Sequence, residues 1–303
     1  MSVRMIGPEA EARLDWLALC RAIEAGHARP RAEIGDTFLY RGGDTLLSRA
    51  AWIDGLGQLV KTATIFPGNV AVGKPAVNGS AAVYSDVDGT LSAIVDFHLL
   101  TKWKTAGDSL CAALRLAPKD PRVILIVGAG TVGRSLRQAY GAAFPGARFQ
   151  LWNRTPVSAA RLAGAFPGTE VVTDLAAAVA GADIVTCATM ATEPVIRGDW
   201  LRPGQHIDLI GAYRPDMREA DDAALRRARI FVDSRATTIG HIGELKIPLA
   251  AGVISEGDVV ADYYDLASGA FARRSEDEIT LFKNGGGAHL DLMVARYILD
   301  AAG

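Results

Sequence analysis

The segment from Arg122 to Thr155 is the part of this chain that most constrains its fold. It opens with a run of aliphatic residues, Val123–Val127, and such a short apolar run is typical of a strand buried on both faces. A glycine-rich turn, Gly128–Gly133, follows, and helical character then extends over Ser135–Ala143. Phe149–Trp152 is a second apolar run of strand length. The pattern predicts a strand, a glycine turn, a helix and a second strand, in that order.

The glycines in this turn have the spacing of a dinucleotide-binding fingerprint. Gly128 would permit the tight turn, Gly130 would let the backbone approach a pyrophosphate, and Gly133 would let the helix pack closely on the strand. The diphosphate would lie on the free N–H groups at the positive end of the helix. The spacing alone is weak evidence, but its place between two strands argues against a ligand-free glycine turn. We expect cofactor contacts from the whole turn: Gly128, Ala129, Gly130, Thr131, Val132 and Gly133.

The tip of the second strand distinguishes between the two nicotinamide cofactors. A carboxylate at this position would bind the ribose hydroxyls of NAD and repel a 2′-phosphate. Here the tip reads Asn153-Arg154-Thr155 and contains no acid. Arg154 offers a planar, charged set of donors to a phosphate, and Asn153 and Thr155 add neutral hydrogen bonds. A solvated surface arginine is the alternative, but the position of Arg154 favours phosphate recognition, so the sequence predicts NADPH (NADP) over NADH.

Size and composition set the broad class of protein. The chain of 303 residues is long enough for two domains, and 50% hydrophobic with 22% charged residues is ordinary for a globular protein. A formal net charge of -2 gives no reason to expect nucleic acid or a membrane surface as a partner. Met1–Arg4 runs into the acidic Glu9 and Glu11 without a long apolar stretch, so we expect no signal peptide. No segment is long and apolar enough to span a bilayer.

Cysteines and histidines indicate no disulfide framework and no metal. The cysteines are odd in number and far apart, at Cys20, Cys111 and Cys187. This pattern predicts a reduced, cytoplasmic protein. Three histidines are scattered without metal-ligand spacing: His27, His98 and His206. Neither a GxSxG elbow nor a catalytic cysteine signature occurs.

The rest of the chain divides into two regions that differ in their predicted secondary structure. Up to the dinucleotide strand it reads as a mostly β layer, with strands at 45–52, 59–65, 81–84 and 91–95, and with helices at 8–25 and about 100–116. Residues 26–43 are hard to assign. After Thr155, strands alternate with helices, which predicts a parallel sheet covered on both faces. A last helix, at about Gly287–Ala301, lies beyond the natural end of that sheet and could return to the first domain.

Short motifs occur in a fixed order along nearly the whole chain. They are Lys61 with Phe66–Asn69, Leu100–Ala106, the glycine fingerprint, Trp152–Thr155, Ala191–Pro194, Gly211–Glu219, and Leu281–Lys283 with Asp291. In these motifs the chain resembles the ornithine cyclodeaminase/mu-crystallin family. The Asn-Arg-Thr tip and the Ala-Thr-Glu-Pro and Arg-Pro-Asp segments resemble the mu-crystallin branch, which uses NADPH to reduce cyclic ketimines.

The resemblance implies a split α/β architecture. A Rossmann-type dinucleotide-binding domain, residues 118–283, would be inserted into a second, α+β domain for substrate binding and dimerisation. Residues 1–117 would form that second domain, completed by 284–303, and the protein would be a homodimer.

The resemblance also implies a set of substrate-site residues. Lys61 matches a substrate-contacting lysine, and Lys104 stands where the family usually carries an arginine that grips the substrate carboxylate. Lysine keeps the charge but loses the two-pronged geometry, and Arg49, where other members tend to have methionine, could supply a replacement. His241 is expected near the ligand, and Asp291 is expected to orient a proton donor or to cap its helix. Outward-facing surface charges are the alternative for Arg49, Lys61 and Lys104, and a capping or surface histidine for His241.

These residues favour the reduction of a small cyclic imino acid, 1-pyrroline-2-carboxylate or its six-membered homologue, to proline or pipecolate. Tyr213 stands where the cyclodeaminase branch has a catalytic aspartate, which favours a reductase over a lyase. A cyclodeaminase or hydroxyproline dehydratase-type lyase, and a non-catalytic NADPH-dependent binding protein, are the alternatives. We also expect cofactor contacts from Asn78, Thr105, Thr189, Met190 and Lys283.

Overall fold

The computed structural model describes residues 3–303, so Met1 and Ser2, at the segment where we expect no signal peptide, lie outside the described residues. The chain forms two compact units. The split unit consists of the residues up to Lys104 together with Gly287–Gly303, and the central unit is Thr105–Gly286. We expected the boundary after residue 117, at the end of a helix. Instead it falls within helix α2 (Phe97–Leu116), of which Phe97–Lys104 belongs to the split unit.

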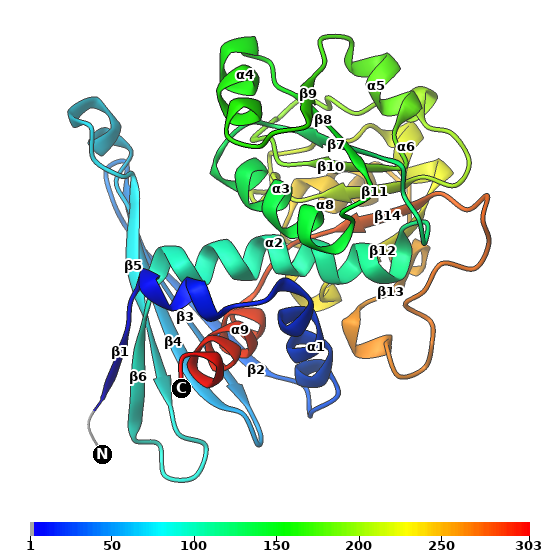
Figure 1. Ribbon diagram of the computed structural model, residues 1–303. Coiled ribbons are helices and arrows are strands. Elements are labelled where there is room, and N and C mark those ends of the chain that lie inside the picture. Colours follow the sequence, from blue (N-terminus) through cyan, green and yellow to red (C-terminus); the bar gives the residue numbers. More distant parts are fainter. Residues whose placement is uncertain (1–2) are drawn as a thin grey trace. The chain divides into compact units, whose positions relative to one another are not determined.

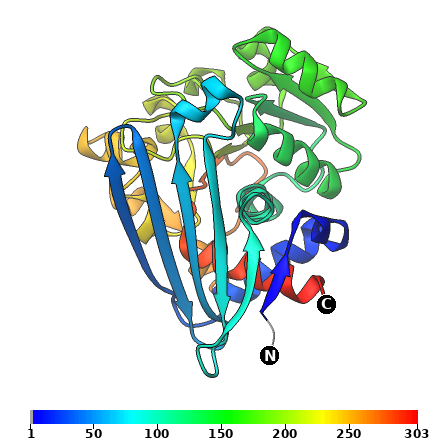
Figure 2. The ribbon, with the colours of Figure 1, turned by 90° about the vertical axis from the view of Figure 1, so that its left-hand side faces the viewer.

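The split unit is built on a six-stranded sheet with the order β1-β6-β5-β4-β3-β2 (Figure 2). β1 runs parallel to β6, and the other neighbours are antiparallel. Buried and half-buried residues alternate along β4, as expected of a strand with one covered face. The strands are β1 (Arg4–Ile6), β2 (Glu33–Arg41), β3 (Asp44–Ile53), β4 (Gly57–Ile65), β5 (Val77–Tyr84) and β6 (Leu91–Asp96).

Helix α9 (Ala288–Ala301) covers this sheet. It packs on β3 and β4 and against helix α1 (Trp16–His27), and almost all of its first eight residues are fully buried (Figure 2). The C-terminal helix therefore belongs to the same compact unit as the N-terminal strands.

The sequence did not predict some elements of the split unit. Strands β1 and β2 were not expected, because β2 has no buried face and so carries no alternation that would mark it. The single helix expected at 8–25 is a 3-10 segment, η1 (Pro8–Arg13), followed by α1, whose start is capped by the Asp15 carboxylate. The motif Phe66–Asn69 runs into a 3-10 segment, η2 (Pro67–Val72).

The central unit has an eight-stranded, fully parallel sheet, which confirms the expected Rossmann-type α/β fold (Figure 1). The strand order is β13-β12-β14-β11-β10-β7-β8-β9. From β7 the chain moves outward through β8 and β9, and then returns to β10 on the other side of β7. The carboxyl ends of β7 and β10 therefore form the topological switch point where such sheets bind ligands.

The bounds of the central elements follow the chain order. The strands are β7 (Val123–Val127), β8 (Arg148–Trp152), β9 (Thr169–Val171), β10 (Ile184–Cys187), β11 (His206–Leu209), β12 (Arg229–Val232), β13 (Val259–Ala261) and β14 (Thr280–Lys283). The helices are α3 (Thr131–Ala143), α4 (Pro156–Gly164), α5 (Leu175–Gly181), α6 (Asp222–Arg227), α7 (Arg235–Thr238) and α8 (Gly243–Ala250), with 3-10 segments η3 (Gly198–Trp200), η4 (Glu256–Asp258) and η5 (Tyr263–Asp265).

Strands β13 and β14 were not predicted as strands. β14 lies between β11 and β12, and all of its residues are buried. Its pattern is too short and too polar at both ends to mark a central strand.

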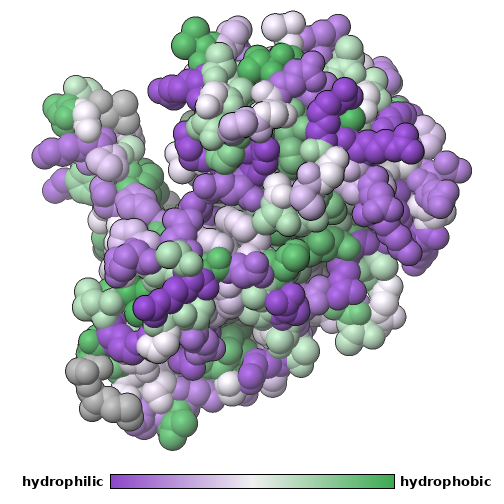
Figure 3. All heavy atoms as spheres, viewed as in Figure 1, coloured by the Kyte–Doolittle hydropathy of each residue, from purple (hydrophilic) through white to green (hydrophobic). Residues whose placement is uncertain are grey.

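On the face of the central unit that Figure 3 shows, hydrophilic residues cover most of the surface and apolar residues form small groups among them. Among residues 3–303, no helix combines the length and the apolar character needed to cross a bilayer.

Candidate substrate and coenzyme sites

The glycine turn between β7 and α3 has a geometry that requires two of its glycines. Gly128 has a φ of 118°, which side chains other than glycine rarely adopt, and a Cβ added to it would lie 2.7 Å from the carbonyl oxygen of Ala188. A Cβ on Gly133 would lie 2.0 Å from the carbonyl oxygen of Gly128. Only glycine therefore lets α3 begin so close to β7.

Gly130 is glycine for a different reason. It is the N-cap of α3, its φ of -84° suits any residue, and a Cβ added to it would meet no atom within 4 Å. No packing within the protein therefore demands a glycine here. Open space at the N-terminus of a long helix is what a pyrophosphate needs, and Thr131 beside it is exposed. The turn thus fits the dinucleotide that the fold implies.

The tip of β8 is tied to the glycine turn by one amide. Oδ1 of Asn153 accepts from the Ala129 N–H at 3.0 Å, and its Nδ2 donates to the Thr155 carbonyl at 3.0 Å. Asn153 thus orders the tip by internal hydrogen bonds, and its expected hydrogen bond to a phosphate stays a prediction. Arg154 and Thr155 are exposed, and within residues 3–303 no ion pair engages Arg154. The guanidinium at the tip therefore has no acidic competitor.

Glu219 organises the carboxyl ends of β10 and β11, and the sequence did not single out its role. Its Oε1 accepts from the backbone N–H and the hydroxyl of Thr189, at 2.7 and 2.8 Å. Its Oε2 accepts from the N–H groups of Gly211 and Ala212, at 2.6 and 3.3 Å. One buried carboxylate thus joins the two loops beside the switch point, and only contacts across the fold could reveal this.

A second buried carboxylate supports the first. Glu244 on α8 accepts from the backbone N–H groups of Glu219 and Ala220, at 2.7 and 3.0 Å. Burial, together with the charge of Glu219, raises the pKa of Glu244 to about 7. The segment from Gly211 to Ala220 is therefore held at both ends by buried carboxylates.

The other cofactor residues expected in the central unit occupy different environments. Met190, after β10, is 75% exposed and open to a ligand, whereas Thr189 is half-buried and engaged by Glu219. Lys283 is fully buried, and its Nζ donates to the Leu209 carbonyl at 2.9 Å. Lys283 is as fully buried as Asp291, and a direct contact between Lys283 and the cofactor stays a prediction. The Thr105 carbonyl accepts from Nδ2 of Asn284 at 3.1 Å.

The split unit brings together three residues expected to bind the substrate and Asp291, which was expected to orient a proton donor or to cap its helix. Lys61 on β4 donates from Nζ to Oδ1 of Asp291 on α9, at 2.8 Å, and both side chains are buried. Nη1 of Arg49, on β3, lies 3.9 Å from Oδ2 of the same carboxylate. Lys104 on α2 is also buried, at 9% exposure, and its charge acts on Asp291. We name Arg49, Lys61, Lys104 and Asp291 the basic cluster.

Neighbouring side chains fix the members of the basic cluster. The second Nη of Arg49 donates to Oδ2 of Asp36 on β2 at 2.6 Å, and the Lys61 ammonium lies 4.9 Å from the centroid of the Phe97 ring. The sequence analysis missed both Asp36 and Phe97, because their roles depend on sheet register and on helix packing. In the register of the sheet, Arg49 pairs with Asp36 on one side and with Lys61 on the other.

Burial and the neighbouring charges shift the pKa values of Lys61 and Asp291. Burial lowers the pKa of Lys61, and the charges of Lys104 and Arg49 lower it further, against the opposing attraction of Asp291. Burial alone would raise the pKa of Asp291, but the three cations outweigh burial and lower it. Asp291 is therefore ionised at neutral pH, and Lys61 holds its proton less tightly than a solvated lysine does.

Two buried histidines lie next to this cluster. His289 is two residues before Asp291 on α9, and its ring meets that of His27 edge to face, with centroids 5.4 Å apart. Burial lowers the pKa of His289 well below its usual range and that of His27 to about 4, so both rings are neutral at neutral pH. They add no further charge to the basic cluster.

Two further expected residues are exposed. His241 belongs to the central unit, where it lies between α7 and α8. Asn78 is exposed on β5, and its Nδ2 donates to the Pro75 carbonyl at 3.2 Å.

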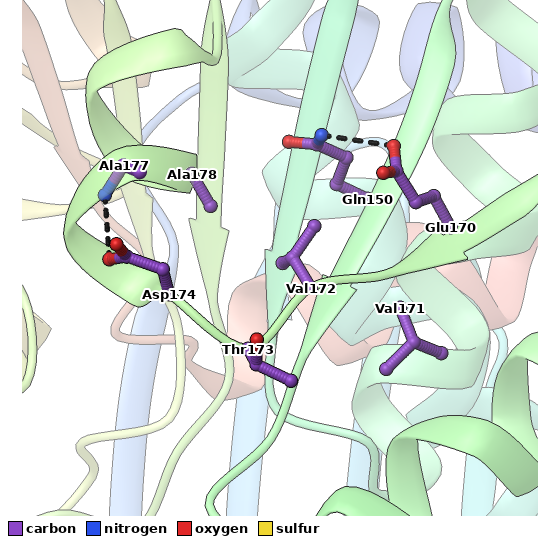
Figure 4. A pocket seen from close by; sticks show the side chains of 8 residues that line it. All are labelled: Gln150, Glu170, Val171, Val172, Thr173, Asp174, Ala177 and Ala178. Carbon is purple, nitrogen blue, oxygen red and sulfur yellow. Dashed lines mark hydrogen bonds between the residues drawn. The ribbon is translucent and has the colours of Figure 1, made fainter.

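A pocket of about 370 Å³ opens in the central unit beside β8, β9 and α5 (Figure 4). Gln150 donates to Glu170 on its wall at 3.1 Å, and Asp174 caps α5 by accepting from the Ala177 N–H. The pocket is lined by none of the residues predicted for the cofactor or substrate sites, and the carboxylates of Glu170 and Asp174 would repel a phosphate. In the described part of the chain, no group of histidine, cysteine and acidic side chains could hold a metal ion.

Comparison with known proteins gives a consistent result. The sequence model of the ornithine cyclodeaminase/mu-crystallin family matches residues 54–303. The chain is 54% identical over 296 residues to the Δ1-pyrroline-2-carboxylate reductase of Paracoccus denitrificans, covering 96% of this chain and 94% of that protein.

Solved structures give the same picture. The Δ1-pyrroline-2-carboxylate reductase of Thermococcus litoralis, in complex with NADH and L-proline, superposes with a TM-score of 0.91 at 25% identity, covering 99% of this chain and 97% of that one. An archaeal alanine dehydrogenase dimer with bound NAD gives a TM-score of 0.90 at 25% identity, covering 100% and 96% of the two chains.

Proposed function

This chain belongs to the ornithine cyclodeaminase/mu-crystallin family, and we propose that it is a nicotinamide-coenzyme-dependent reductase of a small cyclic imino acid. The substrates we propose are 1-pyrroline-2-carboxylate and 1-piperideine-2-carboxylate, which would yield proline and pipecolate. The observation that carries the proposal is the basic cluster, supported by the 54% identity to a Δ1-pyrroline-2-carboxylate reductase.

The charges of the cluster favour a carboxylate ligand. Arg49, Lys61 and Lys104 bring three positive charges, and Asp291 and Asp36 bring two negative ones, so one positive charge remains in excess. A buried charge without a partner is costly, and a substrate carboxylate would balance it. Lys104, which makes no ion pair with any residue from 3 to 303, is the side chain we assign to this carboxylate, together with Arg49.

The same residues can manage the proton that reduction requires. When bound, the coenzyme supplies a hydride to the imine carbon, and the nitrogen then needs a proton. Lys61 has a lowered pKa, so its ammonium can release a proton. The Asp291 carboxylate, 2.8 Å from Nζ, holds the Lys61 side chain in position. We assign Lys61 as the proton donor and Asp291 as the group that positions it.

A steady-state assay tests this function. We expect coenzyme oxidation to depend on 1-pyrroline-2-carboxylate or 1-piperideine-2-carboxylate, with the matching amino acid as product. A lyase would instead form product from ornithine or 3-hydroxyproline without net coenzyme oxidation. A binding protein would bind coenzyme and turn over none of these compounds, and either outcome would overturn the proposal.

We propose further that NADPH is preferred over NADH, on the strength of the exposed Arg154 at a strand tip without an acid. Charge-assisted hydrogen bonds to a 2′-phosphate contribute about 1.5–3 kcal/mol. Arg154→Ala should therefore lower kcat/KM for NADPH by roughly tenfold or more and leave that for NADH nearly unchanged. Arg161→Ala, an exposed arginine on the neighbouring α4, is the matched control. An equal loss with both coenzymes would contradict the assignment.

The protein is also proposed to form a homodimer through the split unit. All nine residues of the edge strand β2 are exposed, and Phe38 and Tyr40 stack on it with their ring centroids 6.2 Å apart. An exposed apolar edge strand invites pairing with another chain. Sedimentation should give a dimer for the native chain and a monomer for Phe38→Glu/Tyr40→Lys, whereas Val87→Glu, at a 95% exposed turn residue, should remain dimeric. A native monomer would rule the dimer out.

A cytoplasmic location is the remaining part of the proposal. Cys20, Cys111 and Cys187 are all free and buried, which suits a reducing compartment. Fractionation of the source cells would test this location.

A further inference from the structure

Two atoms of the basic cluster are buried without a hydrogen-bond partner among residues 3–303, and they are complementary. Nε of Arg49 is a donor, and Oδ2 of Asp291 is an acceptor. Nη1 of Arg49 lies 3.9 Å from Oδ2 of Asp291, a distance too long for a hydrogen bond. Each unpaired group costs free energy in the interior, so the cluster has one position for an acceptor and one for a donor.

The two oxygens of Asp291 also differ in their surroundings. Oδ1 is engaged by the Lys61 ammonium at 2.8 Å, whereas Oδ2 makes no hydrogen bond to the described residues. Asp291 is fully buried, so water from bulk solvent does not reach Oδ2 freely. A ligand that satisfies Oδ2 must therefore present an N–H or O–H group next to the anion that Arg49 and Lys104 attract.

From this arrangement we propose that Oδ2 of Asp291 accepts the N–H of the protonated substrate ring nitrogen, so that Asp291 selects the iminium form of a cyclic imino acid. The inference rests on the proposed reductase function and adds the orientation of the substrate. Its carboxylate lies on Arg49 and Lys104, and its nitrogen lies on Asp291. Lys61 and the substrate nitrogen thus share one carboxylate, one on each oxygen.

The chemistry balances in this orientation. A bound reduced nicotinamide would supply the hydride that forms the C–H bond at the imine carbon, and the C=N π electrons would become the nitrogen lone pair. The coenzyme is oxidised and the iminium is reduced to a neutral secondary amine that still carries its N–H. Lys61 then donates its proton to the lone pair, and the product leaves as the ammonium form of the amino acid.

The orientation also predicts which compounds are excluded. A 2-oxo acid has a carbonyl oxygen where the imino acid has its N–H, so it would bring a lone pair against the Asp291 anion. Leaving a buried charged acceptor unpaired weakens binding by roughly tenfold or more. The basic cluster therefore selects ligands that present a hydrogen-bond donor to Oδ2 of Asp291 over ligands of similar size that present an acceptor there.

Two planar ring acids of nearly the same shape test this directly. Pyrrole-2-carboxylate has an N–H next to its carboxylate, and furan-2-carboxylate has an oxygen acceptor in the same place. Their inhibition constants are measured with the coenzyme-loaded native enzyme against 1-pyrroline-2-carboxylate. We expect pyrrole-2-carboxylate to bind at least tenfold more tightly. Equal binding of the two acids, in enzyme that turns over the imine, would overturn the role of Asp291 and leave the reductase function standing.

Variants localise the effect. Asp291→Asn should reduce the pyrrole-to-furan ratio to near one, since an amide can offer either a donor or an acceptor. Asp36→Asn, which loosens Arg49 from its other side, should weaken both acids alike and keep the ratio. A ratio that is preserved in Asp291→Asn would overturn the proposal. Absence of both turnover and binding of either acid in the native enzyme would overturn the reductase function together with it.

Discussion

At the scale of single residues, the ion pair between Lys61 and Asp291 distinguishes this chain from a generic dinucleotide-binding protein. The sequence gives both residues as candidates, but a lysine in a strand is as often an outward-facing charge. Only the structure shows that β4 turns Lys61 inward and that α9 brings Asp291, 230 positions later, to within 2.8 Å. The alternation along a strand sets two possible faces, and long-range packing decides between them.

The first prediction concerns the loss of Lys61. Lys61→Met leaves the Asp291 carboxylate fully buried with its hydrogen bond removed, so the free energy of unfolding should fall by about 3 kcal/mol. kcat should fall by roughly a hundredfold or more, because proton donation is lost. Denaturant unfolding and steady-state kinetics measure the two effects. The double variant Lys61→Met/Asp291→Asn should recover stability but not activity, and recovery of activity would contradict the role of Lys61.

At the scale of elements, the dinucleotide turn is the part of the fold that the sequence predicts best. Gly128, Gly130 and Gly133 lie in one continuous segment, so their roles follow from local geometry. The edge strand β2 and the central strand β14 could not be predicted in this way. β2 has no buried face, and β14 is recognisable only because β11 and β12 pair with it on either side. Their identity depends on pairing with distant segments.

The glycines provide a matched pair of variants for the second prediction. Gly133→Ala would place a Cβ 2.0 Å from the Gly128 carbonyl oxygen, so the unfolding free energy should fall by about 1–3 kcal/mol. Gly130→Ala meets no protein atom within 4 Å and should leave that free energy nearly unchanged, but its methyl group would occupy the space for the pyrophosphate. Titration with coenzyme should show weakened binding in Gly130→Ala. Native-like coenzyme binding in this variant would argue against a pyrophosphate at the turn.

The third prediction concerns the carboxylates that hold the loop Gly211–Ala220. Burial raises the pKa of Glu244 from 4.5 to about 7, so between these pH values the folded state binds a proton that the unfolded state has released. The contribution of Glu244 to stability is therefore present below pH 4.5 and declines as the pH rises towards about 7. At about 1.4 kcal/mol per pKa unit, the decline amounts to roughly 3 kcal/mol.

Glu244→Gln isolates this effect from the other buried titrating groups. The difference in unfolding free energy between the native chain and Glu244→Gln should change with pH across this range. The same comparison with Glu193→Gln, at an exposed position, should be flat. A flat difference for Glu244→Gln as well would show that this carboxyl group titrates alike in the folded and unfolded states.

At the scale of the whole molecule, each compact unit holds one part of the expected chemistry. The central unit carries the dinucleotide turn and an arginine at the strand tip, and the split unit carries the basic cluster. The cluster is assembled from β3, β4, α2 and α9, which lie at opposite ends of the chain, so periodicity alone could not reveal it. Its residues were found through family resemblance, whereas its supporting residues Asp36 and Phe97 were not.

The path of the hydride tests the account most directly. The enzyme is given 1-pyrroline-2-carboxylate and coenzyme carrying two deuterium atoms at C4 of the nicotinamide, and the proline formed is analysed by mass spectrometry and NMR. One deuterium should appear at C2 of every proline, with one coenzyme oxidised per proline. Proline without deuterium, or no proline from enzyme that binds the coenzyme, would contradict the account.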